Sequence, residues 1–380
     1  MQLQVVGGGL AGLVAAIEAA ERGVDVRLSE AHEQLGGRAR TSTAPHVAHE
    51  GPHVLYSDGP TWAWLVRRRL VGGTSGVPLR AMGRFFFLRS GALHRVPPRG
   101  LVRVLTAREP APVEQSFATW AGRRWGADSA RAAAAASGVV TYHHDPGSLS
   151  ARFVQERLQR AFGLPPRATY VHGGWPVLVE RLAAAARQRG VVIETGHRVT
   201  ELPTGGPVVL AVPLASARLL LDDDTLRQPS GASALVDVAV RADRRDAFVV
   251  SDLDTGGWLE RFSLPDPSLA PAGESLVQAQ VPFGPDDSRE VAIGRVETLL
   301  DAGVPGWRGR LTWRRDALAR GRTGAVDLPG RTWRDRPQVD RGDGVFLAGD
   351  EVAAPGLLSE VSFASALAAV EAALAGSRVH

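Results

Sequence analysis

Three glycines near the N-terminus have the spacing of a loop that binds a dinucleotide. Gly7, Gly9 and Gly12 follow the short apolar segment 2–6, which has the composition of a buried parallel strand. Gly7 permits a tight turn, Gly9 lets the backbone approach a pyrophosphate, and Gly12 lets the next helix pack closely on the strand. A helix over about residues 10–22 would direct its N-terminal N–H groups at the phosphates.

A carboxylate stands where such a ligand needs one. Glu30 ends a second predicted strand, eighteen residues after Gly12, and can accept hydrogen bonds from both hydroxyls of an adenosine ribose. The same charge would repel the 2′-phosphate of NADP. A glycine-rich turn without a ligand is the simpler alternative. The strand, helix, second strand and carboxylate nevertheless all stand at the right distances, so a dinucleotide site is the prediction.

Composition limits what can surround this site. The 380 residues suffice for one large domain or two moderate ones, and no apolar run reaches the eighteen residues of a membrane span. The chain has no cysteine, and a strand begins almost at its N-terminus, so we expect no signal peptide and a cytoplasmic location. The basic residues are all arginine, which GC-rich coding explains better than an anionic partner. Because acidic residues are interspersed and the net charge is only +4, no nucleic-acid partner is expected.

A second glycine pair extends the pattern beyond a plain dinucleotide loop. Gly36-Gly37-Arg38 follows Glu30, and Gly51-Pro52-His53 comes soon after. The stretch 7–41 resembles the FAD-binding signature of the superfamily of flavin amine oxidases, protoporphyrinogen oxidases and phytoene desaturases. In that family the Gly-Gly-Arg turn wraps the cofactor and the Gly-Pro pair lies near the flavin ring. The resemblance implies FAD rather than NAD, although Arg38 has an alternative role in a surface ion pair.

Two distant segments complete the resemblance. Val199 belongs to a middle block in which a strand edge meets the adenine through its backbone, and Gly349-Asp350 is similar to the family's C-terminal motif. A carboxylate at the end of a strand can bind ribityl or ribose hydroxyls. The next helix, about 357–374, can favour negative charge on a reduced flavin. The cofactor-binding residues implied are Gly7, Gly9, Leu10, Ala11, Gly12, Glu30, Gly36, Gly37, Arg38, Gly51, Pro52, His53, Val199, Gly349, Asp350 and Leu358.

The two ends of the chain are thus expected to build one site, which predicts a discontinuous domain. The predicted fold class is α/β (α+β overall), with a Rossmann-like FAD-binding domain formed by residues 1–75, 171–225 and 326–380. Residues 76–170 and 226–325 would form an inserted substrate-binding domain of mixed sheet and helices.

Two features of the inserted part have alternative interpretations. Residues 84–96 alternate basic and aromatic side chains, as membrane and nucleic-acid surfaces do, but two strands around a Ser90-Gly91 turn fit the pattern better. The run from Thr141 to Ser150 is similar to a segment of the protoporphyrinogen oxidase branch. Within it, His143-His144 could bind a metal, but no carboxylate stands at metal-ligand spacing, so a turn is favoured and no metal is predicted.

Few side chains near the motifs could take part in chemistry. A flavin supplies the difficult electronics itself, so no catalytic triad is needed and none is visible. His53, Tyr56 and Trp175 are the catalytic candidates, with His172 as a further possibility. Each could orient a substrate or act as acid or base, and each could equally be a packed side chain. Covalent attachment of the flavin through a histidine stays open.

The chain departs from the family's amine oxidases in ways that narrow the reaction. Many of them hold a water against flavin N5 with a lysine, and this chain has no lysine. Aligning Glu360 with the glutamate of their C-terminal motif puts Leu358 where they carry an aromatic cage residue. The loop 266–273 also resembles one of the carotenoid-type desaturases. These departures favour the desaturase side of the family.

The first hypothesis is therefore an FAD-dependent dehydrogenase, desaturase or oxidase. It would take hydride from a carbon of a mainly hydrophobic small molecule to flavin N5, and O2 or another acceptor would reoxidise the flavin. One alternative is amine oxidation with an altered aromatic cage. Two others are a redox-neutral isomerase or dehydroxylase-type reaction, and a flavoprotein with a binding or regulatory role.

Overall fold

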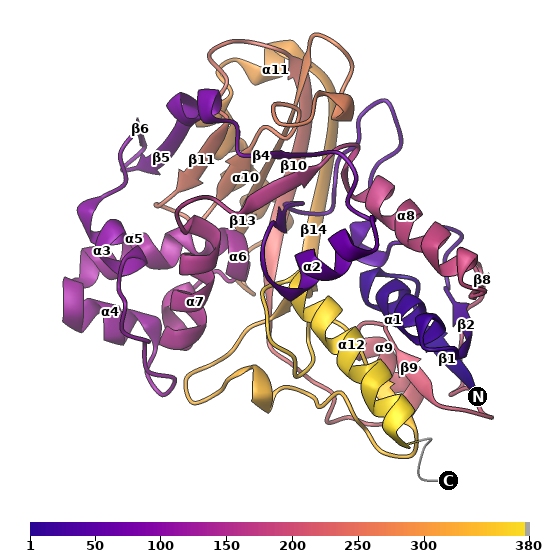
Figure 1. Ribbon diagram of the computed structural model, residues 1–380. Coiled ribbons are helices and arrows are strands. Elements are labelled where there is room, and N and C mark those ends of the chain that lie inside the picture. Colours follow the sequence, from indigo (N-terminus) through magenta and orange to yellow (C-terminus); the bar gives the residue numbers. More distant parts are fainter. Residues whose placement is uncertain (377–380) are drawn as a thin grey trace.

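The computed structural model describes residues 1–376 and is built around two β-sheets (Figure 1). The first sheet has five parallel strands in the order β15-β9-β1-β2-β8. In that order, their bounds are Val345–Leu347, Val208–Leu210, Gln2–Val6, Asp25–Ser29 and Val192–Glu194. Strands from the two ends and the middle of the chain are therefore neighbours in one sheet.

Helices cover both faces of this sheet, because parallel strands buried on both sides need apolar cover. α1 (Leu10–Glu21), α8 (Gly174–Gln188) and α12 (Ser359–Gly376) pack on one face and share a core with it. α9 (Leu214–Leu221) packs on the other face. The result is a three-layer arrangement in which the N-terminal glycine loop lies at the carboxyl end of β1.

The second sheet has seven strands in the order β14-β10-β13-β12-β11-β5-β6. In that order, their bounds are Leu311–Ala325, Ser230–Arg241, Glu274–Pro282, Trp258–Glu260, Val249–Asp252, Phe85–Arg89 and Ala92–His94. One face is apolar and packs against α10 (Arg289–Gly303) and Trp307 of α11 (Trp307–Arg310). The opposite face carries buried polar side chains, which become part of the candidate site.

A group of helices lies beside the second sheet, on the left of Figure 1. Four of these helices share a core of their own: α3 (Arg99–Leu105), α4 (Phe117–Trp125), α5 (Ala127–Ala136) and α7 (Ala151–Phe162). The short α6 (Gly138–Thr141) packs instead against Leu357, through Val139 and Val140. A small sheet, β3-β7-β4 (Leu55–Tyr56, Ala168–Val171 and Thr74–Gly76), and α2 (Gly59–Arg67) complete the fold.

The predicted fold class is confirmed: a Rossmann-like sheet is assembled from separate segments, with a mixed sheet and helices inserted between them. The hairpin expected within 84–96 forms as β5 and β6, with Ser90 and Gly91 both at positive φ in its turn. The domain bounds remain a prediction. All strands of the first sheet lie within the predicted FAD-binding segments, and all strands of the second sheet lie within the predicted substrate-binding segments. One local expectation was wrong. Val199 lies outside any strand, because β8 ends at Glu194.

Among the described residues, α12 alone is long and apolar enough to cross a membrane. It packs against α1, and its Phe363, Ala366, Ala369 and Val370 are almost fully buried in the core. Burial inside the protein accounts for the composition of this helix without a membrane.

Candidate cofactor and substrate site

The N-terminal loop has the close packing that its glycines predict. Gly7 adopts φ +107°, a conformation that other residues rarely take, and its N–H donates to the Ser29 carbonyl at 2.8 Å. A Cβ on Gly12 would lie 1.8 Å from the Gly7 carbonyl oxygen. Only glycine at position 12 therefore lets α1 begin this close to β1. α1 begins directly after this loop, at Leu10, and the N-terminus of a helix is where a phosphate would bind.

Glu30 is buried beside this loop. One of its carboxylate oxygens accepts the Gly8 N–H at 2.7 Å, and the other accepts the His32 N–H at 2.9 Å. These bonds hold the carboxylate at the end of β2, and each oxygen keeps a further lone pair for a ribose hydroxyl. The predicted role of Glu30 thus fits its place in the structure.

The second glycine pair lies directly against the first loop. Gly36 (φ +115°) donates its N–H to the Gly8 carbonyl at 2.8 Å. A Cβ on Gly37 (φ +55°) would lie 3.3 Å from Cα of Gly9. Two glycine turns from different segments therefore meet back to back, and a side chain on Gly37 would press them apart.

Arg38 and Asp350 connect the two ends of the chain. The Arg38 guanidinium forms an ion pair with the Asp350 carboxylate and donates to the Arg322 carbonyl at 2.9 Å. Burial acts to lower the pKa of Arg38, but Asp350, Glu351 and Glu50 together raise it above its ordinary value. Arg38 of the N-terminal motif and Asp350 of the C-terminal motif thus converge, and the pair is partly open to solvent on the Arg38 side.

Two histidines stack next to Gly51-Pro52. The rings of His49 and His53 lie 3.4 Å apart at 16°, and Phe262 covers the second ring at 3.9 Å. Burial lowers the pKa of His53 to about 3 and that of His49 well below its ordinary value. Both rings are therefore neutral near pH 7. A hydrogen-bonding role fits His53 better than exchange of a proton with bulk solvent, and its catalytic role stays a prediction.

The tautomer of His49 follows from its one side-chain bond. The Trp175 N–H donates to His49 Nε2 at 3.0 Å, so Nε2 carries the lone pair and Nδ1 carries the proton. This Nδ1–H is buried and has no acceptor among the described residues. A buried donor without a partner is costly, and it indicates the position of an acceptor on a ligand.

The other predicted catalytic residues lie near this histidine pair or near Leu358. Trp175 is the second residue of α8, and its backbone N–H bonds His49. Tyr56 lies in β3, and the Arg160 guanidinium carbon lies over its ring, 4.3 Å from the ring centre. Burial raises the pKa of the Tyr56 hydroxyl. His172 is exposed and bonds Ser75 at 2.6 Å, so it lies apart from the others.

A polar wall on the second sheet was not predicted from the sequence. Cross-strand neighbours form a row, Arg315–Asp237–Gln278–Glu260, that runs over β14, β10, β13 and β12. Arg315 binds Asp237 with two nitrogens, at 2.9 and 2.6 Å, and Gln278 donates to both Asp237 and the His49 carbonyl. Burial raises the pKa of Asp237 to about 6, although Arg315 opposes the shift. The row fixes the loop that carries His49 and Gly51.

This wall has unused hydrogen-bonding capacity. Of the nine buried side-chain atoms without a partner in the described residues, five lie on this face or in the histidine pair facing it: Gln278 Oε1, Gln280 Nε2, Ser251 Oγ, His49 Nδ1 and His53 Nδ1. Native proteins leave few such groups unsatisfied. Their concentration in one place indicates that a polar part of a ligand binds here. The signal in the sequence was the pair of glutamines on alternate positions of an otherwise apolar strand, 276–281.

Glu260 closes the wall at its far end. It accepts hydrogen bonds from the Tyr170 hydroxyl and, at 2.9 Å, from Trp258 Nε1, and burial raises its pKa. Trp258 also belongs to an apolar cluster. The other members of that cluster are Tyr56, Val139, Val140, Ala161, Phe162, Leu357 and Leu358. Leu358, at the predicted cage position, thus faces apolar neighbours, while Glu260 and the glutamines form the polar side.

Tyr142 is a further residue that the sequence did not single out. Its hydroxyl lies 4.0 Å from where a Cβ on Gly51 would be, and it is buried. Burial raises its pKa, Asp350 adds to the effect and Arg38 opposes it, so the hydroxyl keeps its proton near these charges. It makes no hydrogen bond to the described residues. It is therefore a free donor between the Gly51 loop and Asp350.

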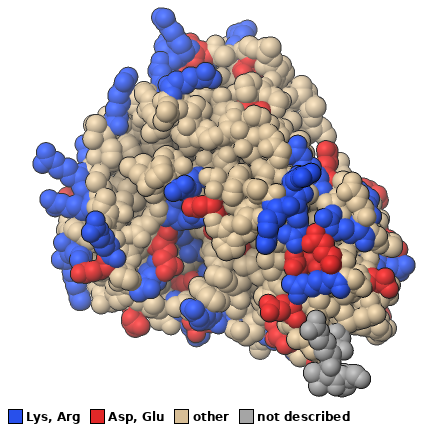
Figure 2. All heavy atoms as spheres, viewed as in Figure 1, with Lys and Arg blue, Asp and Glu red and all other residues tan. Residues whose placement is uncertain are grey.

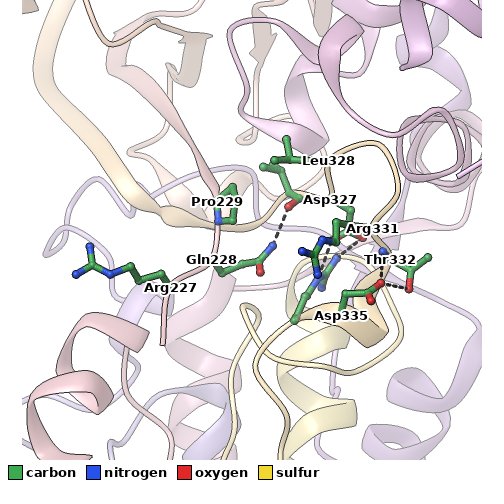
Figure 3. Close-up of a pocket in the computed structure, with 10 residues that line it drawn as sticks. Arg227, Gln228, Pro229, Asp327, Leu328, Arg331, Thr332 and Asp335 are labelled. Carbon is green, nitrogen blue, oxygen red and sulfur yellow. Dashed lines mark hydrogen bonds and ion pairs between the residues drawn. The ribbon is translucent and has the colours of Figure 1, made fainter. Parts of the chain in front are cut away.

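Two pockets lie apart from these residues. One of about 270 Å³ is lined by Arg227, Gln228, Asp327, Arg331 and Arg336 among others (Figure 3). Arg336 and Asp327 form a buried two-bond ion pair there, at 2.8 and 2.9 Å. The other lies next to it and shares Arg227, Asp335 and Arg336. No predicted site residue lines either pocket, and no group of metal-binding side chains occurs in residues 1–376.

The residues present fit a flavin dinucleotide. The glycine turns pack so closely that a Cβ would meet neighbouring atoms, Glu30 and Asp350 follow β2 and β15, two strands of the same parallel sheet, and buried donors without a partner lie in the histidine pair next to Gly51. The contacts of Leu10, Ala11, Pro52, Val199 and Gly349 with a cofactor stay predictions. Val199 is half-buried against the α9 side of the first sheet, in the loop after β8.

Comparisons with known proteins agree with this geometry. A family described as an NAD(P)-binding Rossmann-like domain matches residues 5–69, and one described as flavin containing amine oxidoreductase matches residues 130–374. No curated protein sequence matches the chain.

Solved structures of low sequence identity share the fold. One is an oxidoreductase from Methanosarcina mazei, with 15% identity over 98% of this chain and 100% of that chain and a TM-score of 0.77. Cyclohexylamine oxidase from Brevibacterium oxydans IH-35A has 16% identity over 99% of each chain and a TM-score of 0.73. Reduced UDP-galactopyranose mutase has 14% identity over 98% of this chain and 95% of that chain, with a TM-score of 0.72. At these identities the likeness concerns the fold alone.

Proposed function

The chain belongs to the family of flavin-containing amine oxidoreductases, and on this premise we propose that it binds FAD and takes hydride from a carbon of a mainly hydrophobic small molecule. One observation carries the proposal. Arg38 and Asp350 pair beside the two packed glycine turns, so the predicted dinucleotide loop and the C-terminal motif form one site. A site that runs from the glycine turns to Asp350 suits an adenine dinucleotide that carries a further ring system, as FAD does.

Each element of the site has a defined part in holding FAD. Glu30 would accept from the adenosine ribose, and the amides after Gly9 would bind the pyrophosphate. Asp350 would accept from the ribityl hydroxyls, and its ion pair with Arg38 would hold it in place. His49 and Tyr142 each have a proton to donate, from Nδ1 and from the hydroxyl, and both lie beside the Gly51 loop.

A bound flavin supplies the hydride-accepting chemistry. The protein holds the substrate and excludes water. Leu357, Leu358, Tyr56 and Phe162 offer apolar contacts, and Gln278 and Gln280 can bind a polar group through atoms that have no partner within the described chain. We therefore propose a substrate with a large apolar part and at least one hydrogen-bonding group. O2 or another acceptor would complete the cycle.

Glu260 supports a second candidate, oxidation of an amine. A buried carboxylate at the end of the polar wall could pair with a substrate ammonium, which would lower its raised pKa. Against this stands Leu358 in place of a cage aromatic. The carboxylate and the apolar cluster thus favour different substrates at one site.

Anaerobic mixing distinguishes the candidates. The yellow purified enzyme is mixed without O2 with apolar alcohols or alkenes and with cyclohexylamine, and the flavin absorption is followed. Bleaching by the apolar compounds alone supports the first function. Bleaching by the amine supports the second, in which case Glu260→Gln should lower kcat/KM for the amine by about 10- to 100-fold and the exposed control Glu371→Gln should not. Turnover without bleaching and without an acceptor would show a redox-neutral reaction and overturn both.

A further inference from the structure

One stretch of the chain differs in charge from all the rest. Between Asp58 and Glu109 there is no acidic residue, although the whole protein has 40. The same 50 residues contain ten arginines: Arg67, Arg68, Arg69, Arg80, Arg84, Arg89, Arg95, Arg99, Arg103 and Arg108. Coding bias explains why basic residues are arginine, but not why acidic residues are missing from one segment.

The structure places most of this charge on one edge of the molecule. Residues 79–105 form, in order, a short turn of helix (Leu79–Arg84), β5, β6 and α3. β6 is the terminal strand of the seven-stranded sheet. In Figure 1 these elements lie along the left edge, and in Figure 2, which has the same view, arginine side chains project from that edge.

The arginines of this edge are unpaired. Twenty-one arginines elsewhere in the described chain form ion pairs, among them Arg68 directly after α2, yet none of the seven from Arg80 to Arg108 does. Six of the seven are exposed, and Arg84 is half-buried and donates to a backbone carbonyl. The charge of this edge is therefore available to an external partner.

Apolar side chains are exposed among these arginines. Five of the thirteen exposed large hydrophobic residues lie between positions 79 and 102: Leu79, Met82, Leu93, Val96 and Val102. Leu79 is 88% exposed and Val96 is 74% exposed. On α3, Arg99, Val102 and Arg103 share the outer face, because Leu101 and Val104 are buried in the helical core. Basic and apolar groups thus occupy the same surface.

We propose that this edge, residues 79–103, docks on an anionic membrane surface. Arginines on an edge strand can serve to prevent sheet-to-sheet aggregation, but that role does not explain exposed Leu79 and Val96, which lie outside the strands. A nucleic-acid surface would use the charge and leave the apolar side chains in water. Lipid accommodates both, since the arginines bind the headgroups and the apolar groups enter the boundary with the acyl chains. The proposal does not depend on the substrate.

Vesicle co-sedimentation tests the proposal with the flavin-loaded protein. We expect binding to phosphatidylcholine vesicles that contain phosphatidylglycerol, weak binding to pure phosphatidylcholine, and loss of binding at high salt. The triple variant Arg89→Gln, Arg99→Gln, Arg103→Gln should bind on the order of 100-fold more weakly, because each basic residue near an anionic surface contributes about fivefold. The pair Leu79→Ser, Val96→Ser should lose the binding that remains at intermediate salt.

A matched control keeps the test specific. Arg187, Arg244 and Arg289 are also exposed and unpaired but lie outside this edge. Their triple change to Gln removes the same charge and should leave vesicle binding nearly intact. Unchanged flavin content and melting temperature would show that all variants fold. If both triple variants lost vesicle binding equally, the binding would depend on net charge rather than on this edge, and the proposal would be overturned. So would absence of vesicle binding, or tight binding to duplex DNA with none to vesicles.

Discussion

Arg38 and Asp350 are 312 positions apart in the chain and form a direct ion pair at the carboxyl ends of the parallel strands. The pair joins the Gly-Gly-Arg turn to the C-terminal motif, and neither partner has another carboxylate or guanidinium within ion-pair distance. The geometry of the predicted FAD site therefore depends on a contact between the two ends of the sequence.

Asp350→Asn should weaken FAD binding more than it destabilises the fold. The change removes the charge that holds Arg38 and an acceptor for ribityl hydroxyls, so we expect about a 10- to 100-fold rise in the Kd for FAD. Fluorescence titration of the flavin-free protein measures it. Asp223→Asn, which breaks an ion pair with Arg341 at 2.7 Å, before the amino end of β15 rather than at its motif end, is the control. Equal effects of the two changes would argue against a cofactor role.

Gly12→Ala should prevent normal assembly of the first domain. The added Cβ would lie 1.8 Å from the Gly7 carbonyl, which is backbone and cannot move without shifting α1 from β1. We expect little folded protein or loss of bound flavin, seen by circular dichroism and absorption. Gly122→Ala, in α4, meets no atom within 4 Å and should stabilise by about 0.5–1 kcal/mol. A well-folded, flavin-loaded Gly12→Ala protein would contradict the close packing described for the loop.

The sequence predicted the parts of the site whose reasons are local. The tight turn at Gly7, the close packing at Gly12 and the carboxylate at the end of β2 each follow from neighbours in the chain. Asp350 was identified only through a family resemblance, since nothing near it in the sequence shows its partner. The polar wall was missed because Asp237, Gln278 and Glu260 come from three strands and meet only through their register. His49 was missed because its role depends on a ring stacked above it and on a donor from α8.

Tyr142→Phe should separate cofactor binding from stability. In the described structure the ring is buried but the hydroxyl has no protein partner and is not among the fully buried polar atoms, so its removal should change the stability of the flavin-free protein little. If the hydroxyl donates to FAD, the Kd should rise about 2- to 10-fold. Thermal melting and flavin titration give the two values.

Tyr170→Phe is the matched comparison. Its hydroxyl donates to buried Glu260, so its loss should destabilise the flavin-free protein by about 1–3 kcal/mol. If Tyr142→Phe destabilised the flavin-free protein as much and left the Kd unchanged, the donor role would be refuted.

Glu351 should make stability depend on pH near neutrality. Burial raises its pKa to about 7, and Asp350 adds to the shift while Arg38 opposes it. The folded state therefore holds a proton that the unfolded state releases near pH 4.5. The stability that this bound proton contributes is fully present below pH 4.5, and it is lost as the pH rises through about 7.

Glu351→Gln removes this titration. Between pH 4 and pH 8, its unfolding free energy should gain about 3 kcal/mol relative to the unchanged protein. Urea melts across that range measure the difference, and exposed Glu371→Gln should show none. A difference that does not vary with pH would mean that Glu351 is not held protonated in the folded state.

Titration of the flavin-free protein with FAD shows most directly whether both ends of the chain build one FAD site. We expect saturation at one FAD per chain, with much weaker binding of FMN, because Glu30 and the glycine loop hold the adenosine half. Glu30→Gln should lower the affinity for FAD and leave that for FMN unchanged. Failure of the folded protein to bind FAD, or equal affinity for FMN, would contradict an FAD site built from both ends.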